Sequence, residues 1–199
     1  TEKQRNQLLG SMTDEVSALV LGNNYKQTQA ISLAARRAYE RIAEYKRLMN
    51  DLEARGKLDR AIEFLPSEEQ LNERVAAGHG LTRAELSVLI SYSKIDLKEA
   101  LLNSQVPDDD YLTRDMETAF PPMLVSKFAE AMRRHRLKRE IVTTQLVNRL
   151  VNRMGTTFVV QLSDETGADA AQVASAWYAA STLLGAKAAW QAIEAQDRK

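Results

Sequence analysis

Several residue types and patterns are missing from this sequence, and each absence excludes a class of protein. There is no cysteine among the 199 residues, which excludes disulfide scaffolds, thiolate zinc sites, iron–sulfur clusters and cysteine nucleophiles. No apolar run approaches the ~20 residues that a membrane span requires. Basic and acidic residues both number 27, so no overall field attracts nucleic acid or an anionic membrane. We therefore expect a globular cytoplasmic protein that binds neither nucleic acid nor membrane.

Glycine, proline and aromatic residues are scarce as well. The chain has eight glycines and four prolines, and 6% of its residues are aromatic. The segments between the glycines and prolines are rich in residues that favour helices, and none alternates apolar and polar residues as a half-buried strand would. The sequence predicts an all-α, multi-helix bundle with no β-sheet.

The few glycines and prolines also predict where helices end. We expect a first helix that ends at Gly22 and a long second helix over residues 24–55. Two parts are predicted: N-terminal helices over 1–66, and a compact helical bundle over 67–199. A single continuous domain is the alternative.

Three pairs of residues have the spacing of a capping box, which marks a helix start. They are Ser67 with Gln70, Thr82 with Glu85, and Asp96 with Glu99. Further helices are predicted over 108–120, from Pro121-Pro122 onward, and over 137–154, 156–165, 169–184 and 186–196.

The expected long helix carries a heptad pattern. Its members are Thr28, Ile31, Ala35, Ala38, Ile42, Tyr45, Met49 and Leu52. One interpretation is a coiled-coil arm that joins two chains. The other, which we favour because alanine and tyrosine are weak seam residues, is one long core helix of a bundle.

No catalytic, cofactor-binding or metal-binding constellation is present in the sequence. His79 and His135, the only histidines, lack a second ligand at helical spacing. The motifs of dinucleotide sites, P-loops and serine hydrolases do not occur. The carboxylates at 108–110 lack the glycine turn of a calcium loop and are better explained as helix caps.

Residues 85–94 and 162–173 each have the form of a helix-turn-helix. The second helix of the latter, from Asp169, is rich in alanine and offers few side chains that read bases. We favour an ordinary helical corner. An independent helical adaptor or DNA-binding regulator remains the alternative function.

The strongest charge feature is a basic segment over residues 127–153, with eight basic and two acidic residues. An acidic segment over 108–117 precedes it. The two could pair with each other, or the basic residues could face solvent, a phosphate-bearing ligand or another domain. The candidate interdomain contact consists of Arg133, Arg134, Arg136, Lys138 and Arg139.

A polar row accompanies the apolar stripe of the same predicted helix. After Arg136 it continues with Glu140, Thr144, Asn148 and Asn152, each four residues from the last. Because a buried amide without partners costs about 1–3 kcal/mol, we expect a structural row in which Asn148 and Asn152 are partly buried.

Several longer strings carry a family resemblance. They are SMTDEV at 11–16, LEARGKLDRAIEFLP at 52–66, GLTRAELSVLISYSK at 80–94, LLNSQVPDDDYL at 101–112 and HRLKREIVTTQLVNRLVNRMGTTFV at 135–159. In this order they resemble the C-terminal region of the large bacterial NAD-specific glutamate dehydrogenases. Ala84 and Asp110 stand where the family pattern has proline, at two expected helix starts.

The resemblance implies a parent enzyme that oxidatively deaminates L-glutamate to 2-oxoglutarate and ammonia, with NAD as its cofactor. The catalytic lysine and aspartate and the nucleotide-binding domain would lie upstream, so this segment would hold no catalytic residue and no cofactor. Its start at Thr1 agrees with a piece of a longer protein. Its partners would be the catalytic domain of the same chain and further copies in a homo-oligomer, and its role would be packing, oligomerisation or regulation.

Overall fold

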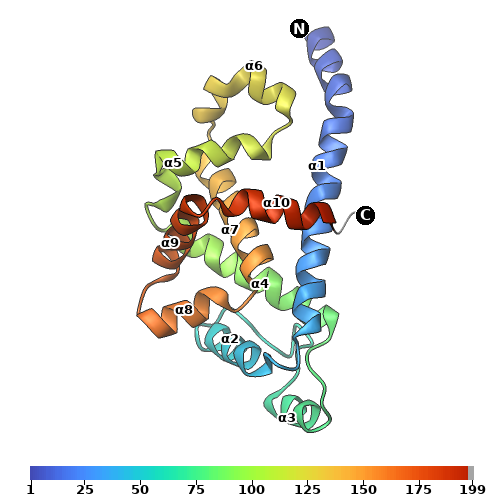
Figure 1. Ribbon diagram of the computed structural model, residues 1–199, viewed down its shortest axis with the longest axis vertical. Helices are drawn as coiled ribbons and strands as arrows, with labels where there is room; N and C mark the ends of the chain where they lie inside the picture. The colour runs from blue at the N-terminus through green and yellow to red at the C-terminus, as the bar shows by residue number, and fades with distance from the viewer. Residues whose placement is uncertain (197–199) are drawn as a thin grey trace.

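The computed structural model describes residues 1–196, except for the side chain of Thr113. Over this range the chain forms ten α-helices, two short 3-10 helices and no strand (Figure 1). The prediction of an all-α fold is therefore confirmed. The elements are α1 (Glu2–Arg36), α2 (Ile42–Ala54), α3 (Glu68–Ala76), α4 (Arg83–Leu102), η1 (Val106–Asp108), α5 (Asp110–Thr113), η2 (Arg114–Ala119), α6 (Pro122–Arg133), α7 (Lys138–Met154), α8 (Phe158–Thr166), α9 (Ala170–Leu183) and α10 (Ala186–Gln196).

Helix α4 is shared by the two apolar clusters of the core. Leu86 and Leu89 in its first half pack with the buried side chains of α2, α3 and the turn between them. Leu97 and Leu101 in its second half pack with buried side chains of η2, α6, α7 and α9. One helix therefore joins the two ends of the core.

Local capping signals account for several helix starts. Ser67 and Thr82 form the predicted capping boxes of α3 and α4. Asp169, at a predicted helix start, forms a further box at α9. Such boxes supply hydrogen-bond partners to backbone amides that have none inside the helix. The two residues of a box are only three positions apart, so the signal can be read from a short stretch of sequence.

The expected helix start at Asp96 is wrong, because Asp96 lies inside α4. Its carboxylate instead accepts hydrogen bonds from Arg55 at 2.7 Å and from Lys57 at 2.6 Å. Burial raises the pKa of Asp96, but these two cations outweigh it and hold the pKa below its usual value. Asp96 therefore does not cap a helix; it connects α4 to the residues at the end of α2.

Helix α1 contains 35 residues and is about 52 Å long at 1.5 Å per residue. It runs through Gly22, so the prediction that a helix ends there is wrong. A Cβ at Gly22 would meet nothing within 4 Å, which means that no close packing requires the glycine. A single glycine costs a helix only about 1 kcal/mol relative to alanine, and good helix formers surround this one.

The expected helix over 24–55 is also wrong. The chain leaves helical geometry after Arg36, turns, and begins α2 at Ile42. The heptad pattern is therefore divided between two helices, so it forms neither a coiled-coil arm nor one long core helix. The turn directs the buried side chains of α2, including Leu48 and Leu52, into the core beside α3 and α4.

The loop that precedes α4 passes close against this turn. A Cβ added to Gly80 would lie 2.4 Å from the carbonyl carbon of Ala38 and 2.4 Å from the nitrogen of Tyr39. Both are backbone atoms, and Ala38 is buried. Only glycine allows the two backbones to approach this closely, and the contact fixes where α1 ends and α2 begins.

A buried acid links α3 to α4 close to the same loop. The Glu85 carboxylate accepts two hydrogen bonds from Arg74, at 2.7 and 2.9 Å, and one from the Thr82 amide at 2.7 Å. Its side chain is only 11% exposed. Burial raises the pKa of Glu85, but the hydrogen bonds from Arg74 and Thr82 outweigh it and lower the pKa.

We predict that Gly80→Ala lowers the free energy of unfolding by about 2–3 kcal/mol, because the added methyl group forces two backbone segments apart. Gly22→Ala, which meets no atom, should raise it by about 0.5–1 kcal/mol. Urea unfolding followed by circular dichroism measures both. A Gly80→Ala variant as stable as the native chain would contradict the proposed close approach.

We predict that Glu85→Gln destabilises the fold by about 1–3 kcal/mol at pH 7, because it weakens charge-assisted hydrogen bonds. The pKa of Glu85 is lower in the folded state than in the unfolded state. Its stabilisation is therefore complete above the unfolded pKa of about 4.3 and is lost as the pH falls through the folded pKa. The difference between variant and native chain should shrink below about pH 4.

Unfolding curves recorded between pH 3 and pH 8 test this dependence. Glu40→Gln is the control, because Glu40 pairs with Arg37 on the surface and both side chains are mostly exposed. It should change stability by less than about 1 kcal/mol at any pH. A Glu85→Gln effect that stays constant down to pH 3 would exclude the assigned role of the carboxylate.

Candidate interdomain surface

The described part of the chain shows no grouping of three or more acidic or histidine residues that could hold a metal ion. Nor is any helix within residues 1–196 long and apolar enough to cross a membrane. Of the two histidines, His79 is exposed in the loop before α4. The Nδ1 atom of His135 accepts a hydrogen bond from the Leu137 amide at 3.1 Å, so it supports a turn.

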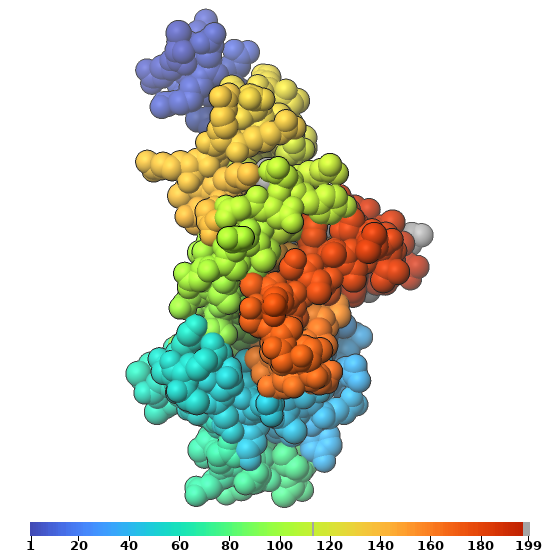
Figure 2. Space-filling view, turned by 90° about the vertical axis from the view of Figure 1, so that its left-hand side faces the viewer, coloured from blue at the N-terminus to red at the C-terminus, as the bar shows by residue number. Residues whose placement is uncertain are grey.

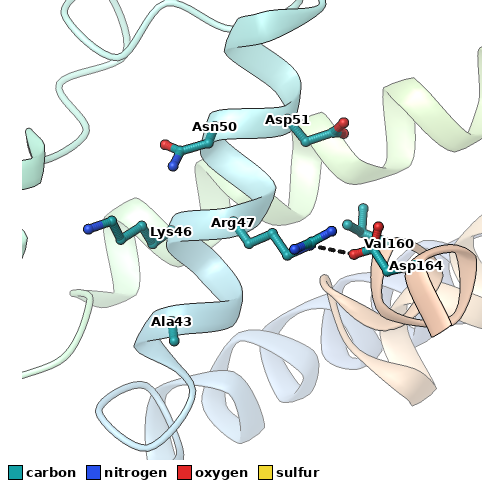
Figure 3. Close-up of a pocket in the computed structure, with 7 residues that line it drawn as sticks. All are labelled: Ala43, Lys46, Arg47, Asn50, Asp51, Val160 and Asp164. Atoms are coloured by element: carbon teal, nitrogen blue, oxygen red, sulfur yellow. Dashed lines mark hydrogen bonds and ion pairs between the residues drawn. The ribbon is translucent and has the colours of Figure 1, made fainter.

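An open pocket of about 520 Å³ lies between α2 and α8 (Figure 3). Figure 3 shows Arg47 reaching from α2 to Asp164 of α8, with which it forms an ion pair. Lys46, also on α2, pairs with Glu68. The cations of the pocket are thus neutralised by the chain itself. The lining residues are Ala43, Lys46, Arg47, Asn50, Asp51, Val160 and Asp164.

The structure brings the acidic segment 108–117 against the basic segment 127–153. Arg139 pairs with Asp108, Arg149 pairs with Asp115 at 2.8 Å, and Arg133 lies 4.0 Å from Glu117. Internal pairing therefore uses three of the basic residues. The remaining positive charge is smaller than the sequence indicates.

Arg139 is one of the predicted contact residues, yet its guanidinium points into its own domain. Besides pairing with Asp108, it donates hydrogen bonds to the carbonyl oxygens of Leu102, at 2.9 Å, and Ser104, at 3.0 Å. Leu102 is the last residue of α4 and Ser104 lies two residues beyond it, where the last carbonyls of a helix lack partners within it. Arg139, a residue of α7, therefore caps the C-terminal end of α4 with its guanidinium group.

Arg149 takes part in a half-buried polar cluster. Its guanidinium lies 5.8 Å from the centre of the Tyr178 ring, and Tyr111 packs edge-on against the same ring at 5.9 Å. Burial and a hydrogen bond with Asp115 raise the pKa of Tyr178 well above its usual value. This cluster joins α7 to α9 and to the acidic segment.

The other predicted contact residues lie on the surface at the end of α6 and the start of α7. Arg133 and Arg134 are 65% and 75% exposed, and Arg134 pairs with Glu130 at 3.4 Å. Arg136 is exposed and Lys138 is half-buried. Neither of these two forms an ion pair with any residue that the structure describes, so they are the uncommitted charges of the set.

The polar row lies along α7. Glu140 is exposed, and Thr144 donates a hydrogen bond to the carbonyl of Glu140 at 2.7 Å. Asn148 and Asn152 are half-buried. The Oδ1 atom of Asn152 is buried without a hydrogen bond from any described residue. The row thus runs from an exposed residue, Glu140, to two half-buried amides, Asn148 and Asn152.

A second surface, on α1, was not singled out from the sequence. Leu9, Val16 and Val20 are 53%, 41% and 52% exposed. They are spaced seven and four residues apart, so at about 100° per residue they lie within about 40° of one another around the helix axis. We call these three residues the outer stripe of α1. Their seven- and four-residue spacing was the signal in the sequence that could have identified this surface.

The space-filling view shows the first turns of α1 at one end of the molecule, beyond α6 (Figure 2). The adjoining side of this part of α1 contacts the body. Met12 is buried, the Ser11 hydroxyl lies 3.2 Å from the sulfur of Met123, and Glu15 accepts a hydrogen bond from the Met123 amide at 3.4 Å. Helix α1 therefore has one covered side and one open apolar side.

Comparison with known families assigns the two ends of the chain differently. Residues 78–199 match a family model described as glutamate dehydrogenase, C-terminal. Residues 1–34 match a model described as bacterial NAD-glutamate dehydrogenase, catalytic domain. The chain thus belongs to the glutamate dehydrogenases: most of it matches their C-terminal model, and its first 34 residues match a catalytic-domain model.

More particularly, the chain belongs to the bacterial NAD-specific glutamate dehydrogenase family, which confirms the resemblance seen in the sequence. It is 77% identical to the NAD-specific glutamate dehydrogenase of Pseudomonas aeruginosa over 89% of this chain and 11% of that protein. It is 52% identical to the Halomonas elongata protein over 100% of this chain and 34% identical to the Mycobacterium tuberculosis protein over 98%, in each case over 12% of the relative. The chain therefore spans about an eighth of the length of these relatives.

We predict that Arg139→Ala lowers the free energy of unfolding by about 1.5–3 kcal/mol, because it leaves carbonyls at the end of α4 and the Asp108 carboxylate without their donor. Arg136→Ala, three residues away and without an ion pair, should change stability by less than about 0.5 kcal/mol. Thermal and urea unfolding of the two variants measure the difference. Equal stabilities would show that Arg139 is a surface charge like Arg136.

Proposed function

We propose that this chain is a non-catalytic helical module of an NAD-dependent glutamate dehydrogenase, and that it holds the catalytic domain in its assembled position. The whole enzyme would convert L-glutamate to 2-oxoglutarate and ammonia, with NAD as hydride acceptor. One observation carries the proposal. A continuous helix, α1, supplies the residues that match the catalytic-domain model and ends in the corner that Gly80 packs against.

The residues of this segment do not fit NAD. Dinucleotides bind at the carboxyl ends of parallel strands, where a glycine-rich turn and a helix N-terminus hold the pyrophosphate. Residues 1–196 contain no strand, and the sequence has no such glycine-rich turn. NAD would therefore bind in the part of the enzyme that precedes this segment. The residues that move protons and hydride would lie in that part as well.

The partners of the module would be the catalytic domain of the same chain and further copies of the enzyme. Arg133, Arg134, Arg136 and Lys138 would supply the charged part of such a contact. Exposed pairs of this kind contribute only about 0–1 kcal/mol each. They would orient the contact more than they strengthen it.

The proposal predicts that the 199-residue chain folds as a helical protein but neither binds NAD nor turns over glutamate. Calorimetric titration with NAD, with circular dichroism as the check on folding, measures the first part, and NADH formation at 340 nm measures the second. The full-length enzyme, assayed in parallel, should do both. Micromolar NAD binding by the folded 199-residue chain would contradict a non-catalytic role.

A further inference from the structure

We propose that the outer stripe of α1, formed by Leu9, Val16 and Val20, is the surface on which the catalytic domain of the same polypeptide packs. The proposal rests on the function proposed above and assigns it a surface. Helix α1 would then be shared by two domains, with adjoining parts of its surface packed on the helical module and on the catalytic domain.

The composition of α1 around the stripe is that of a contact surface. Residues 7–25 contain only two charged residues, Asp14 and Glu15, although 27% of the whole chain is charged. Glu15 lies on the covered side, where its carboxylate accepts a hydrogen bond from the Met123 amide. A helix exposed to solvent ordinarily carries charged residues on its open side, whereas the core of a protein contact is depleted of them.

The contacts of α1 leave the stripe open within this chain. The covered side of its first half is held by Met12 and by the contacts of Ser11 and Glu15 with Met123. Farther along, Ala30 is buried and Ile31 packs against the core cluster around α7. Ile31 lies 11 residues, or about three turns, after Val20, so the stripe continues the line of Ile31 along the helix. Unlike Ile31, the three side chains of the stripe have no core cluster beside them in this chain and remain about half exposed.

The family comparison favours one occupant. Residues 1–34, which include the whole stripe, match the catalytic-domain model, whereas the module that α1 packs on matches the C-terminal model from residue 78 onward. This helix matches the catalytic-domain model by sequence, and the module leaves its stripe about half exposed, so the stripe remains for the rest of the catalytic domain. A second copy of the chain is the competing occupant, and the test separates the two.

Cysteine labelling in the full-length enzyme tests the proposal. Val16→Cys and Leu9→Cys place a thiol on the stripe. Leu21→Cys is the matched control, because Leu21 lies on the same helix, is 68% exposed and is turned about 100° from Val20. Maleimide modification of the peptide that carries each new thiol is followed by mass spectrometry, in the native enzyme and in denaturant.

In the native full-length enzyme, the thiols at positions 9 and 16 should react at least tenfold more slowly than the thiol at position 21. In denaturant, and in the 199-residue chain, the three should react at similar rates. Equal rates in the native enzyme would overturn the proposal. Slow labelling that disappears when the enzyme is diluted to separate subunits would also overturn it, because a second copy would then cover the stripe.

The proposed packing surface and the proposed non-catalytic function can be contradicted independently of each other. If the module bound NAD but the stripe were protected, the non-catalytic role would be wrong and the packing surface would stand. If the stripe labelled freely while the module bound no NAD, only the surface would be wrong.

Discussion

The contact between Gly80 and the turn at Ala38 is the constraint on which most of the architecture depends. It brings the end of α1, the start of α2 and the loop before α4 to one point. Since α4 begins shortly after Gly80 and takes part in both core clusters, this single approach sets the direction from which α4 enters the core. The turn between α1 and α2 also allows α2 to pack its apolar side on α4, because α2 does not continue the direction of α1.

Charge in this protein is balanced locally as well as globally. The acidic segment 108–117 lies against α6 and α7, and its carboxylates pair with Arg139, Arg149 and Arg133. Two of these arginines also serve the fold, one at the end of α4 and one beside Tyr178. Part of the basic segment therefore serves contacts within the module, and the outer stripe of α1 is an uncharged surface that stays about half exposed.

Features that depend on a few neighbouring residues could be predicted from the sequence. The helical class, the capping boxes at Ser67 and Thr82, and the corner at Gly167, whose φ of 73° suits glycine, are of this kind. The end of α1 depends instead on Gly80, which is remote in sequence, and no glycine or proline marks the turn. The candidate site divides in the same way: sequence identified the basic residues, but only packing against the end of α4 distinguishes Arg139 from the exposed Arg136.

Because α1 is unbroken from Glu2 to Arg36, the number of residues between its outer stripe and the part that packs on α7 has a geometric meaning. Each residue turns the helix by about 100° and advances it by about 1.5 Å. One residue inserted between Val20 and Ala30 would thus point the stripe toward a different side of the molecule, although every side chain of the stripe would be retained. The number of residues between the stripe and the packed part of α1 therefore sets the direction in which the stripe points. An insertion or deletion there would rotate the stripe about the helix axis relative to the packed part.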